Sequence, residues 1–171
     1  GTATAATTNS VAIGSLVTAS DSNAVAIGNA NTADQNSVGI GVTATASGGS
    51  AVAIGNSSNV SGYAGIAMGH TAKAQGRDTI ALGTSTVAAS DNSIVIGTPR
   101  ILDTAGKVTT STVYTTTGTK TYATAIGPGA TASEYKTIAL GANSLAEGTR
   151  SISIGGSIES VNTPDKRTIT Q

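Results

Sequence analysis

Few residues of this 171-residue chain have side chains that support catalysis or metal binding. Cys is absent and the only His is His70, which rules out a disulfide, a thiolate metal site and a site with two His from one chain. His70 follows Gly69 where similar segments carry polar turn residues, so we expect an exposed or interface side chain rather than a ligand. No combination of acid, base and nucleophile appears. The sequence therefore predicts no catalytic residue, no metal, no cofactor and no enzymatic activity.

The side chains best suited to binding another molecule stand between residues 98 and 123. The candidate ligand-binding residues are Arg100, Lys107, Tyr114, Lys120 and Tyr122. Tyr and Arg are favoured at recognition surfaces, and protruding loops often carry function. The same segment could instead pack against a neighbouring subunit and stabilise an assembly, and the sequence leaves both roles open.

Charge and hydropathy exclude two classes of partner. The nine basic and nine acidic residues balance to a net charge of zero and are scattered along the chain. A surface that binds nucleic acid needs basic residues clustered on one face. No apolar run approaches the roughly 20 residues that a membrane-spanning helix needs. We expect neither nucleic-acid binding nor membrane contact by this part of the protein.

A short apolar motif that ends in glycine occurs ten times along the chain. Ser10–Gly14 reads Ser-Val-Ala-Ile-Gly, and Thr79–Gly83 reads Thr-Ile-Ala-Leu-Gly. The closing glycines are 14 residues apart, apart from one spacing of 13 and one of 30; they are Gly14, Gly28, Gly41, Gly55, Gly69, Gly83, Gly97, Gly127, Gly141 and Gly155. A fixed period of this length is typical of repeat architectures, in which each unit buries its apolar residues only against its neighbours.

Each repeat is expected to contribute two short β-strands. The large apolar residues alternate, as Val11 and Ile13 do, which is the spacing of side chains on one face of a strand. Small residues alternate three and five positions after each glycine, as at Ala44 and Ala46, and turn formers connect the strands. The sequence predicts an all-β parallel roll of two-strand, 14-residue coils. We expect the large residues of one strand to face the small residues of the other across a thin core.

A column of small residues lies between the two large residues of each repeat. With the large residues in the core, alternation would place this column on the outer face of its strand. An unbroken apolar outer column favours close packing by another copy in an oligomer of closed symmetry, although an Ala-rich chain could show such a bias without any contact. The residues predicted to pack between subunits are Ala12, Ala26, Ala53, Ala67, Ala81, Val95, Ala125 and Ala139, and the column also includes Gly39 and Ser153.

An insert interrupts the repeat between Gly97 and Gly127. The spacing of 30 leaves 16 residues beyond one normal repeat. Residues 103–106, Asp-Thr-Ala-Gly, have the composition of a turn, and the segments 107–114 and 119–122 are rich in Thr and Tyr. These features predict a β-hairpin that leaves the roll.

The repeated pattern [Ser/Ala]-Val-Ala-Ile-Gly-x-x-Ala-x-Ala resembles the YadA-like head domain of trimeric autotransporter adhesins, over residues 10–160. The resemblance implies a left-handed parallel β-roll assembled as a homotrimer, with the small column as its trimer-packing surface. Hairpin inserts of this general kind occur in the family. The resemblance divides the chain into head repeats at 1–97, an insert at 98–123, head repeats at 124–160 and the start of a neck at 161–171.

The same resemblance implies a virulence-associated adhesin head on the bacterial cell surface, held to the outer membrane by a C-terminal region absent from this sequence. Besides the chain itself, the implied partners are extracellular matrix proteins such as collagen, fibronectin and laminin, host cells or abiotic surfaces. Many weak contacts repeated along the trimeric roll would provide avidity. The alternative function is a rigid structural spacer that presents another adhesive domain. Acyltransferase and calcium-binding repeat folds fit less well, because their sequence periods and ligand spacings differ from this pattern.

Overall fold

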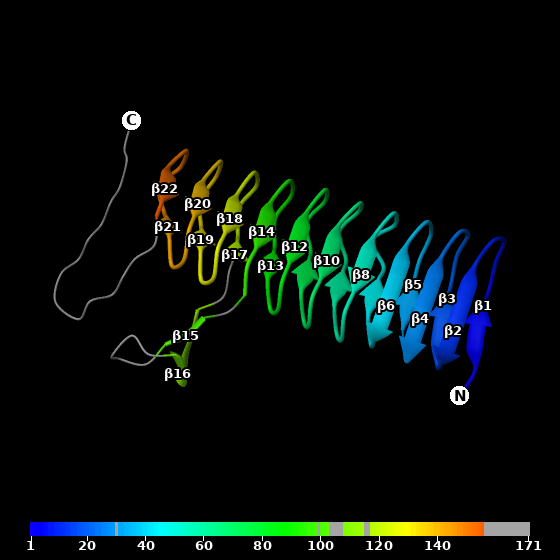
Figure 1. Ribbon diagram of the computed structural model, residues 1–171. Helices are drawn as coiled ribbons and strands as arrows, with labels where there is room; N and C mark the ends of the chain where they lie inside the picture. Colours follow the sequence, from blue (N-terminus) through cyan, green and yellow to red (C-terminus); the bar gives the residue numbers. More distant parts are fainter. Residues whose placement is uncertain (30, 99, 103–107, 115–116, 156–171) are drawn as a thin grey trace.

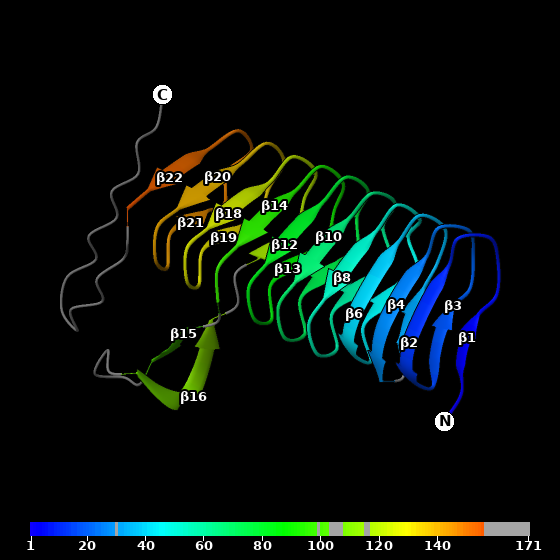
Figure 2. The same cartoon turned by 45° about the vertical axis from the view of Figure 1, so that its right-hand side comes forward.

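The structure is a computed structural model that describes residues 1–29, 31–98, 100–102, 108–114 and 117–155. The chain winds into a rod of stacked coils, and each complete coil contributes one strand to each of two parallel sheets (Figures 1 and 2). The described residues make about nine complete coils. The predicted neck at 161–171 lies outside the described residues. No helix in the described part of the chain is long and apolar enough to span a membrane.

The two sheets contain ten strands each in the described part of the chain. Sheet 1 consists of β2 (Val11–Ser15), β4 (Val25–Asn29), β6 (Val38–Val42), β8 (Val52–Ile54), β10 (Ile66–Met68), β12 (Ile80–Leu82), β14 (Ile94–Ile96), β18 (Thr124–Ile126), β20 (Ile138–Leu140) and β22 (Ile152–Ile154). Sheet 2 consists of β1 (Ala3–Ala5), β3 (Val17–Ala19), β5 (Thr32–Ala33), β7 (Thr45–Ala46), β9 (Asn59–Val60), β11 (Lys73–Ala74), β13 (Val87–Ala88), β17 (Thr117–Gly118), β19 (Thr131–Ala132) and β21 (Leu145–Ala146).

The register confirms the predicted coil. Equivalent residues of successive repeats are direct partners, so that Ile66 pairs with Ile80 and Ala67 with Ala81. The insert is accommodated in the same way, because Ile94 pairs with Thr124 across the longer spacing. Identical positions therefore stack into columns that run the length of the rod.

The glycine column explains why the motif ends as it does. Gly69 has a φ of +142°, a backbone conformation that L side chains rarely adopt. A Cβ on Gly69 would lie 2.5 Å from the carbonyl oxygen of Gly83 in the next coil. The bend at Gly69 therefore needs glycine both for its backbone angle and for the close approach of the next coil. The same holds at Gly14, Gly28, Gly41, Gly55, Gly83 and Gly127.

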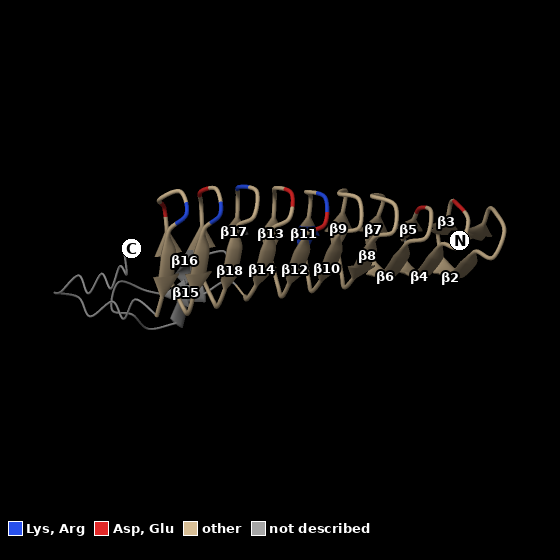
Figure 3. Ribbon diagram, turned by 90° about the horizontal axis from the view of Figure 1, so that it is seen from above, with Lys and Arg blue, Asp and Glu red and all other residues tan. Residues whose placement is uncertain are grey.

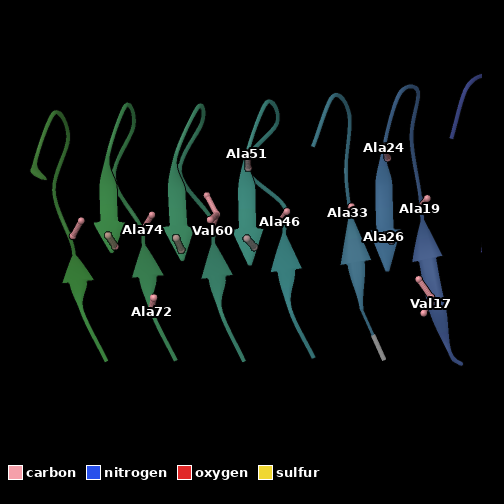
Figure 4. Close-up of a cluster of buried hydrophobic side chains, with 14 of the residues drawn as sticks. Val17, Ala19, Ala24, Ala26, Ala33, Ala46, Ala51, Val60, Ala72 and Ala74 are labelled. Atoms are coloured by element: carbon pink, nitrogen blue, oxygen red, sulfur yellow. The ribbon is translucent and has the colours of Figure 1, made fainter. Parts of the chain in front are cut away.

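The interior of the roll contains the small side chains of both strands (Figure 4). The columns three and five residues after each glycine face inward as predicted, and Ala44 and Ala46 have no exposed area. The column between the large residues is also inside: Ala26, Ala53, Ala67, Ala81, Val95, Ala125 and Ala139 are fully buried in the single chain, and Ala12 packs against the same core.

The prediction that this column packs between subunits is therefore wrong. The large residues that were expected in the core point outward instead, and Ile13 remains 56% exposed and Ile126 37% exposed. The physical reason is space: both strands of a coil present small residues to the interior, and the thin gap between the sheets has no room for a column of Ile or Val. Alternation then forces the large residues onto the outer face of sheet 1.

Three of the larger side chains in this thin core each lie beside a glycine. A Cβ on Gly118 would lie 3.0 Å from Cγ2 of Val95, and a Cβ on Gly65 would lie 2.7 Å from Cγ1 of Val60. Asn31 likewise occupies the space beside Gly39 and donates a hydrogen bond to its carbonyl oxygen. At these three places the absence of a Cβ on the glycine leaves room for the larger side chain beside it.

Buried hydroxyls in the core are satisfied within their own turns. Thr79 donates to the carbonyl oxygen of Gly76 over 2.9 Å, and Thr86 donates to that of Gly83 over 2.9 Å. Each hydroxyl bonds to a residue three positions earlier in the chain, which closes the turn that precedes the next strand. These two hydroxyls therefore replace Ala in the core without being left unpaired, whereas Oδ1 of the core residue Asn31 is buried and has no hydrogen-bond partner among the described residues.

The insert forms a hairpin that leaves the roll (Figure 2). Its strands are β15 (Arg100–Leu102) and β16 (Val108–Tyr114), which pair antiparallel. The turn predicted at 103–106 lies outside the described residues. The Thr- and Tyr-rich composition of residues 119–122 had suggested that they belong to the hairpin. The roll resumes at β17 instead, so these residues form a loop of the roll.

Candidate functional site

The outer face of sheet 1 is a continuous aliphatic surface. It carries the two large residues of every repeat, Val11, Ile13, Val25, Ile27, Val38, Ile40, Val52, Ile54, Ile66, Met68, Ile80, Leu82, Ile94, Ile96, Ile126, Ile138, Leu140, Ile152 and Ile154, with Thr124 the polar exception. All are at least partly exposed in the single chain. Ten strands about 4.8 Å apart make this surface about 43 Å long. An apolar surface of that size on a protein usually marks an interaction site.

The outer face of sheet 2 is more polar and equally regular. One residue of each coil points outward at its centre, and the described members of this column are Thr4, Thr18, Thr32, Thr45, Asn59, Lys73, Val87, Thr131 and Leu145. Thr18, Thr32 and Thr45 are direct register partners. The first coils therefore present a flat row of threonines, and the later coils present a mixed surface.

Charged side chains are concentrated along one edge of the roll (Figure 3). Of the described Lys, Arg, Asp and Glu side chains, all except Lys73 lie in the loops that lead from sheet 2 back to sheet 1. These loops form the charged edge, with residues 20–23, 34–36, 47–50, 61–64, 75–78, 89–92, 119–122, 133–136 and 147–150. The charged groups of the described roll that electrostatic recognition would need are therefore concentrated on the charged edge (Figure 3).

The predicted ligand-binding residues do not form one site. Arg100 and Tyr114 are partners across the hairpin, from β15 to β16. Lys107 lies outside the described residues. Lys120 and Tyr122 are exposed in a loop of the charged edge.

Tyr122 has neighbours that sequence reasoning missed. Its ring lies 5.8 Å from that of Tyr135 in an edge-to-face arrangement, and Nζ of Lys136 lies 5.8 Å and 5.1 Å from the centres of the two rings. The signal was present in the sequence, because Tyr122 and Lys136 occupy the same position in successive repeats and such residues stack.

His70 is exposed beside its turn, as expected. No group of three His, Cys, Asp or Glu in the described part of the chain could hold a metal ion.

Comparisons with known proteins agree with this geometry. The profile of the YadA head domain repeat matches residues 1–16, 35–58, 61–86, 74–98, 119–144 and 132–157, which together make up more than half of the chain. Among solved structures, the collagen-binding domain of the Yersinia adhesin YadA is similar, with a TM-score of 0.65 and 23% sequence identity; the match covers 86% of this chain and 73% of that one. No curated protein matches. With its glycine-ended repeats stacked into parallel coils, the chain belongs to the YadA head domain family, a family of adhesin heads exposed on bacteria.

Proposed function

We propose that this chain is a homotrimeric adhesin head that attaches a bacterium to extracellular matrix, to host cells or to abiotic surfaces. The observation that carries the proposal is the division of the roll into two faces, one aliphatic on sheet 1 and one regular and more polar on sheet 2. The first suits permanent assembly with other copies, and the second suits repeated contact with a ligand.

Assembly is argued from the aliphatic face. A partner of the same chain would have the same length and the same coil spacing, so that two such faces could interdigitate side chain by side chain along the whole rod. Three copies around one axis would cover the face on every chain. The number three comes from the resemblance to trimeric adhesins. In such a trimer, the hairpin of β15 and β16 would either contact a neighbouring copy or bind a ligand.

A single cysteine tests this assembly, because the natural chain has none. Ile54→Cys places a thiol on the aliphatic face, and we expect mild oxidation to yield disulfide-linked chains. Thr45→Cys, in the outward column of sheet 2, is the matched control and should remain single. A second variant, Val52→Cys, places a thiol at another position of the same face. Equal cross-linking of Ile54→Cys and Thr45→Cys would reject the proposed interface, and so would the absence of cross-linking from both Ile54→Cys and Val52→Cys.

Adhesion is argued from the faces that assembly leaves free. The sheet 2 column repeats once per coil and would be tripled by symmetry, so weak contacts at each coil would add up through avidity rather than through a deep pocket. The relative of known structure is described as collagen-binding, which makes collagen the first target to test, followed by fibronectin and laminin. The head would act at the cell surface, anchored in the outer membrane through a C-terminal region.

The adhesive function is tested by coating beads with the purified chain and measuring their retention on collagen, fibronectin, laminin and plain plastic under flow. We expect retention on at least one matrix protein above that of beads coated with albumin. The variant Thr18→Glu/Thr32→Glu/Thr45→Glu should lower it by placing three like charges in one row. Retention equal to that of albumin on every surface would instead favour a rigid spacer that presents another domain.

A further inference from the structure

The charged edge changes its character along the rod at one structural position. The last residue of each loop has a left-handed backbone, and in several coils this residue is Asn, namely Asn9, Asn23, Asn36 and Asn92. In the last three coils of the described roll it is Tyr122, Lys136 and Arg150, with φ values of +61°, +56° and +63°. Asn tolerates this backbone conformation well, whereas Tyr, Lys and Arg adopt it at an energetic cost. Large residues kept in a strained conformation point to a function for their side chains.

These three residues lie in one row on adjacent coils. The backbone N–H of Lys136 donates to the carbonyl oxygen of Thr121 over 3.3 Å, and that of Arg150 donates to Tyr135 over 2.9 Å. Each loop is thereby tied to the loop before it. The backbone of the row is therefore held in place at the end of the charged edge, and its three side chains start from fixed, neighbouring positions.

The row gathers two aromatic rings and an ammonium group. Nζ of Lys136 lies within 6 Å of both ring centres, which is the range of a cation–π interaction. The rings are still 48% exposed at Tyr122 and 38% exposed at Tyr135, and Lys136 and Arg150 are exposed as well. The two rings and the ammonium group of Lys136 thus lie close together, and all of these side chains keep part of their surface exposed.

The charge of this cluster favours a ligand with a single negative group over a polyanion. Lys120, Lys136 and Arg150 contribute three positive charges, and Glu134 and Glu147 in the same loops contribute two negative ones. The nearest acidic residue of the preceding loop, Asp91, accepts a hydrogen bond from the backbone N–H of Arg77 on its far side. A dense polyanion would meet the two glutamates, whereas one carboxylate could pair with Lys136 or Arg150 alone.

We propose that Tyr122, Tyr135, Lys136 and Arg150 form a binding site for an acidic sugar at the end of a host glycan. The negative face of an exposed tyrosine ring attracts the polarised C–H groups of a pyranose ring. The cationic side chains pair with the carboxylate of the sugar. Each site is shallow and weak, and the copies in an assembly add up by avidity. This inference rests on the adhesive function proposed above, for which it names one ligand class and its site.

The test compares sialyllactose with lactose on the same polymer carrier, because the two probes differ only in the acidic sugar. Biolayer interferometry with the full chain should show stronger binding to the sialyllactose polymer, by about tenfold or more if the carboxylate pair is worth a typical charged hydrogen bond. The variant Tyr122→Asn/Lys136→Asn/Arg150→Asn restores the residue found in other coils, so it should fold normally and lose this preference. Tyr63→Thr removes an exposed tyrosine elsewhere on the same edge and is the control that should bind as the natural chain does.

The outcomes separate this site from the wider adhesive function. Retention on a matrix protein without any preference for sialyllactose would overturn the glycan site and leave adhesion intact. An unchanged preference in the triple variant would overturn the assignment of these residues. Binding of an immobilised polyproline peptide that disappears in the triple variant, with no sugar binding, would mean that the tyrosines receive an extended peptide instead, and would equally overturn the proposal. Circular dichroism of each variant checks that the roll is intact.

Discussion

The pairing of large and small side chains across the core can be measured at Val95 and Gly118. In the neighbouring coils the same two positions are Ala81 with Ala88 and Ala125 with Ala132. The variant Val95→Ala/Gly118→Ala should therefore rebuild the standard coil, although each single substitution disturbs it. This makes the pair a direct test of volume conservation in a core only two side chains thick.

The magnitudes follow from the geometry. Val95→Ala removes two buried methyl groups, which costs about 1.6 kcal/mol in transfer free energy and about 1 kcal/mol more for the space left behind. Gly118→Ala brings a Cβ to 3.0 Å from Cγ2 of Val95, closer than ordinary contact. That overpacking costs about 1–3 kcal/mol, and the lower entropy of the unfolded chain offsets about 0.5–1 kcal/mol of it. Gly118 has no left-handed backbone, so no further strain arises.

The double variant should be within about 1 kcal/mol of the natural chain, which gives a coupling energy of about 2–5 kcal/mol between the two positions. The assay is urea denaturation followed by circular dichroism, at one fixed protein concentration for all four proteins because the proposed assembly would contribute to stability. If the double variant loses as much free energy as the two single variants combined, the two side chains do not share one space and the reasoning fails.

Three further predictions test other parts of the fold. Gly69→Ala should destabilise the roll by several kcal/mol because its Cβ would meet the backbone of Gly83. Gly148→Ala is the control and should change the melting temperature little, because the nearest atom to its Cβ would be 3.6 Å away. Equal effects of the two substitutions would show that the Gly69 position does not need glycine. Leu16→Asn should raise the free energy of unfolding by about 1 kcal/mol, because Leu16 is 61% exposed with a φ of +56°, and a lower melting temperature would show that the leucine is covered. Thr79→Val should cost about 1–2 kcal/mol in thermal unfolding because it leaves the carbonyl of Gly76 without the hydroxyl, and a neutral result would mean that this buried bond contributes nothing.

The repeat was predictable from sequence because almost every coil has the same glycine spacing and the same alternation of large and small residues. The fixed glycine spacing and the alternation at Ala44 and Ala46 suffice to predict two-strand coils stacked in parallel, and the register confirms them. A chain with a single copy of this motif would not have given the answer. Repetition turns weak local preferences into a reliable pattern.

Which face of the sheet 1 strands lies in the core was not predictable by the same route. Period-two alternation tells which residues share a face, but it does not tell which face is inside when both are apolar. At Val52, Ala53 and Ile54, the larger residues were assigned to the core because burial of large aliphatic residues is the general trend. The available volume decides otherwise, since a thin core opposed by small residues accepts mostly Gly, Ala, Ser or Thr, with an occasional Val or Asn.

The binding cluster at the charged edge was only half visible in the sequence. Tyr122 was identified as a candidate from its residue type, but it was grouped with Arg100 and Tyr114 because they are close in sequence. The fold separates them, since the roll resumes at Thr117. Counting back ten residues from Gly127 gives Thr117, just as counting back from Gly97 gives Val87, so the coil spacing could have placed Tyr122 in the roll.

The most direct test of the account is the mass of the chain in solution, measured by sedimentation equilibrium for the natural sequence and for Ile54→Asp/Ile80→Asp. The account predicts three times the mass of one chain for the natural protein, and loss of that assembly when two charges are placed on the aliphatic face. A natural chain that sediments as a folded single copy would contradict it, and so would a charged variant that keeps the mass of three.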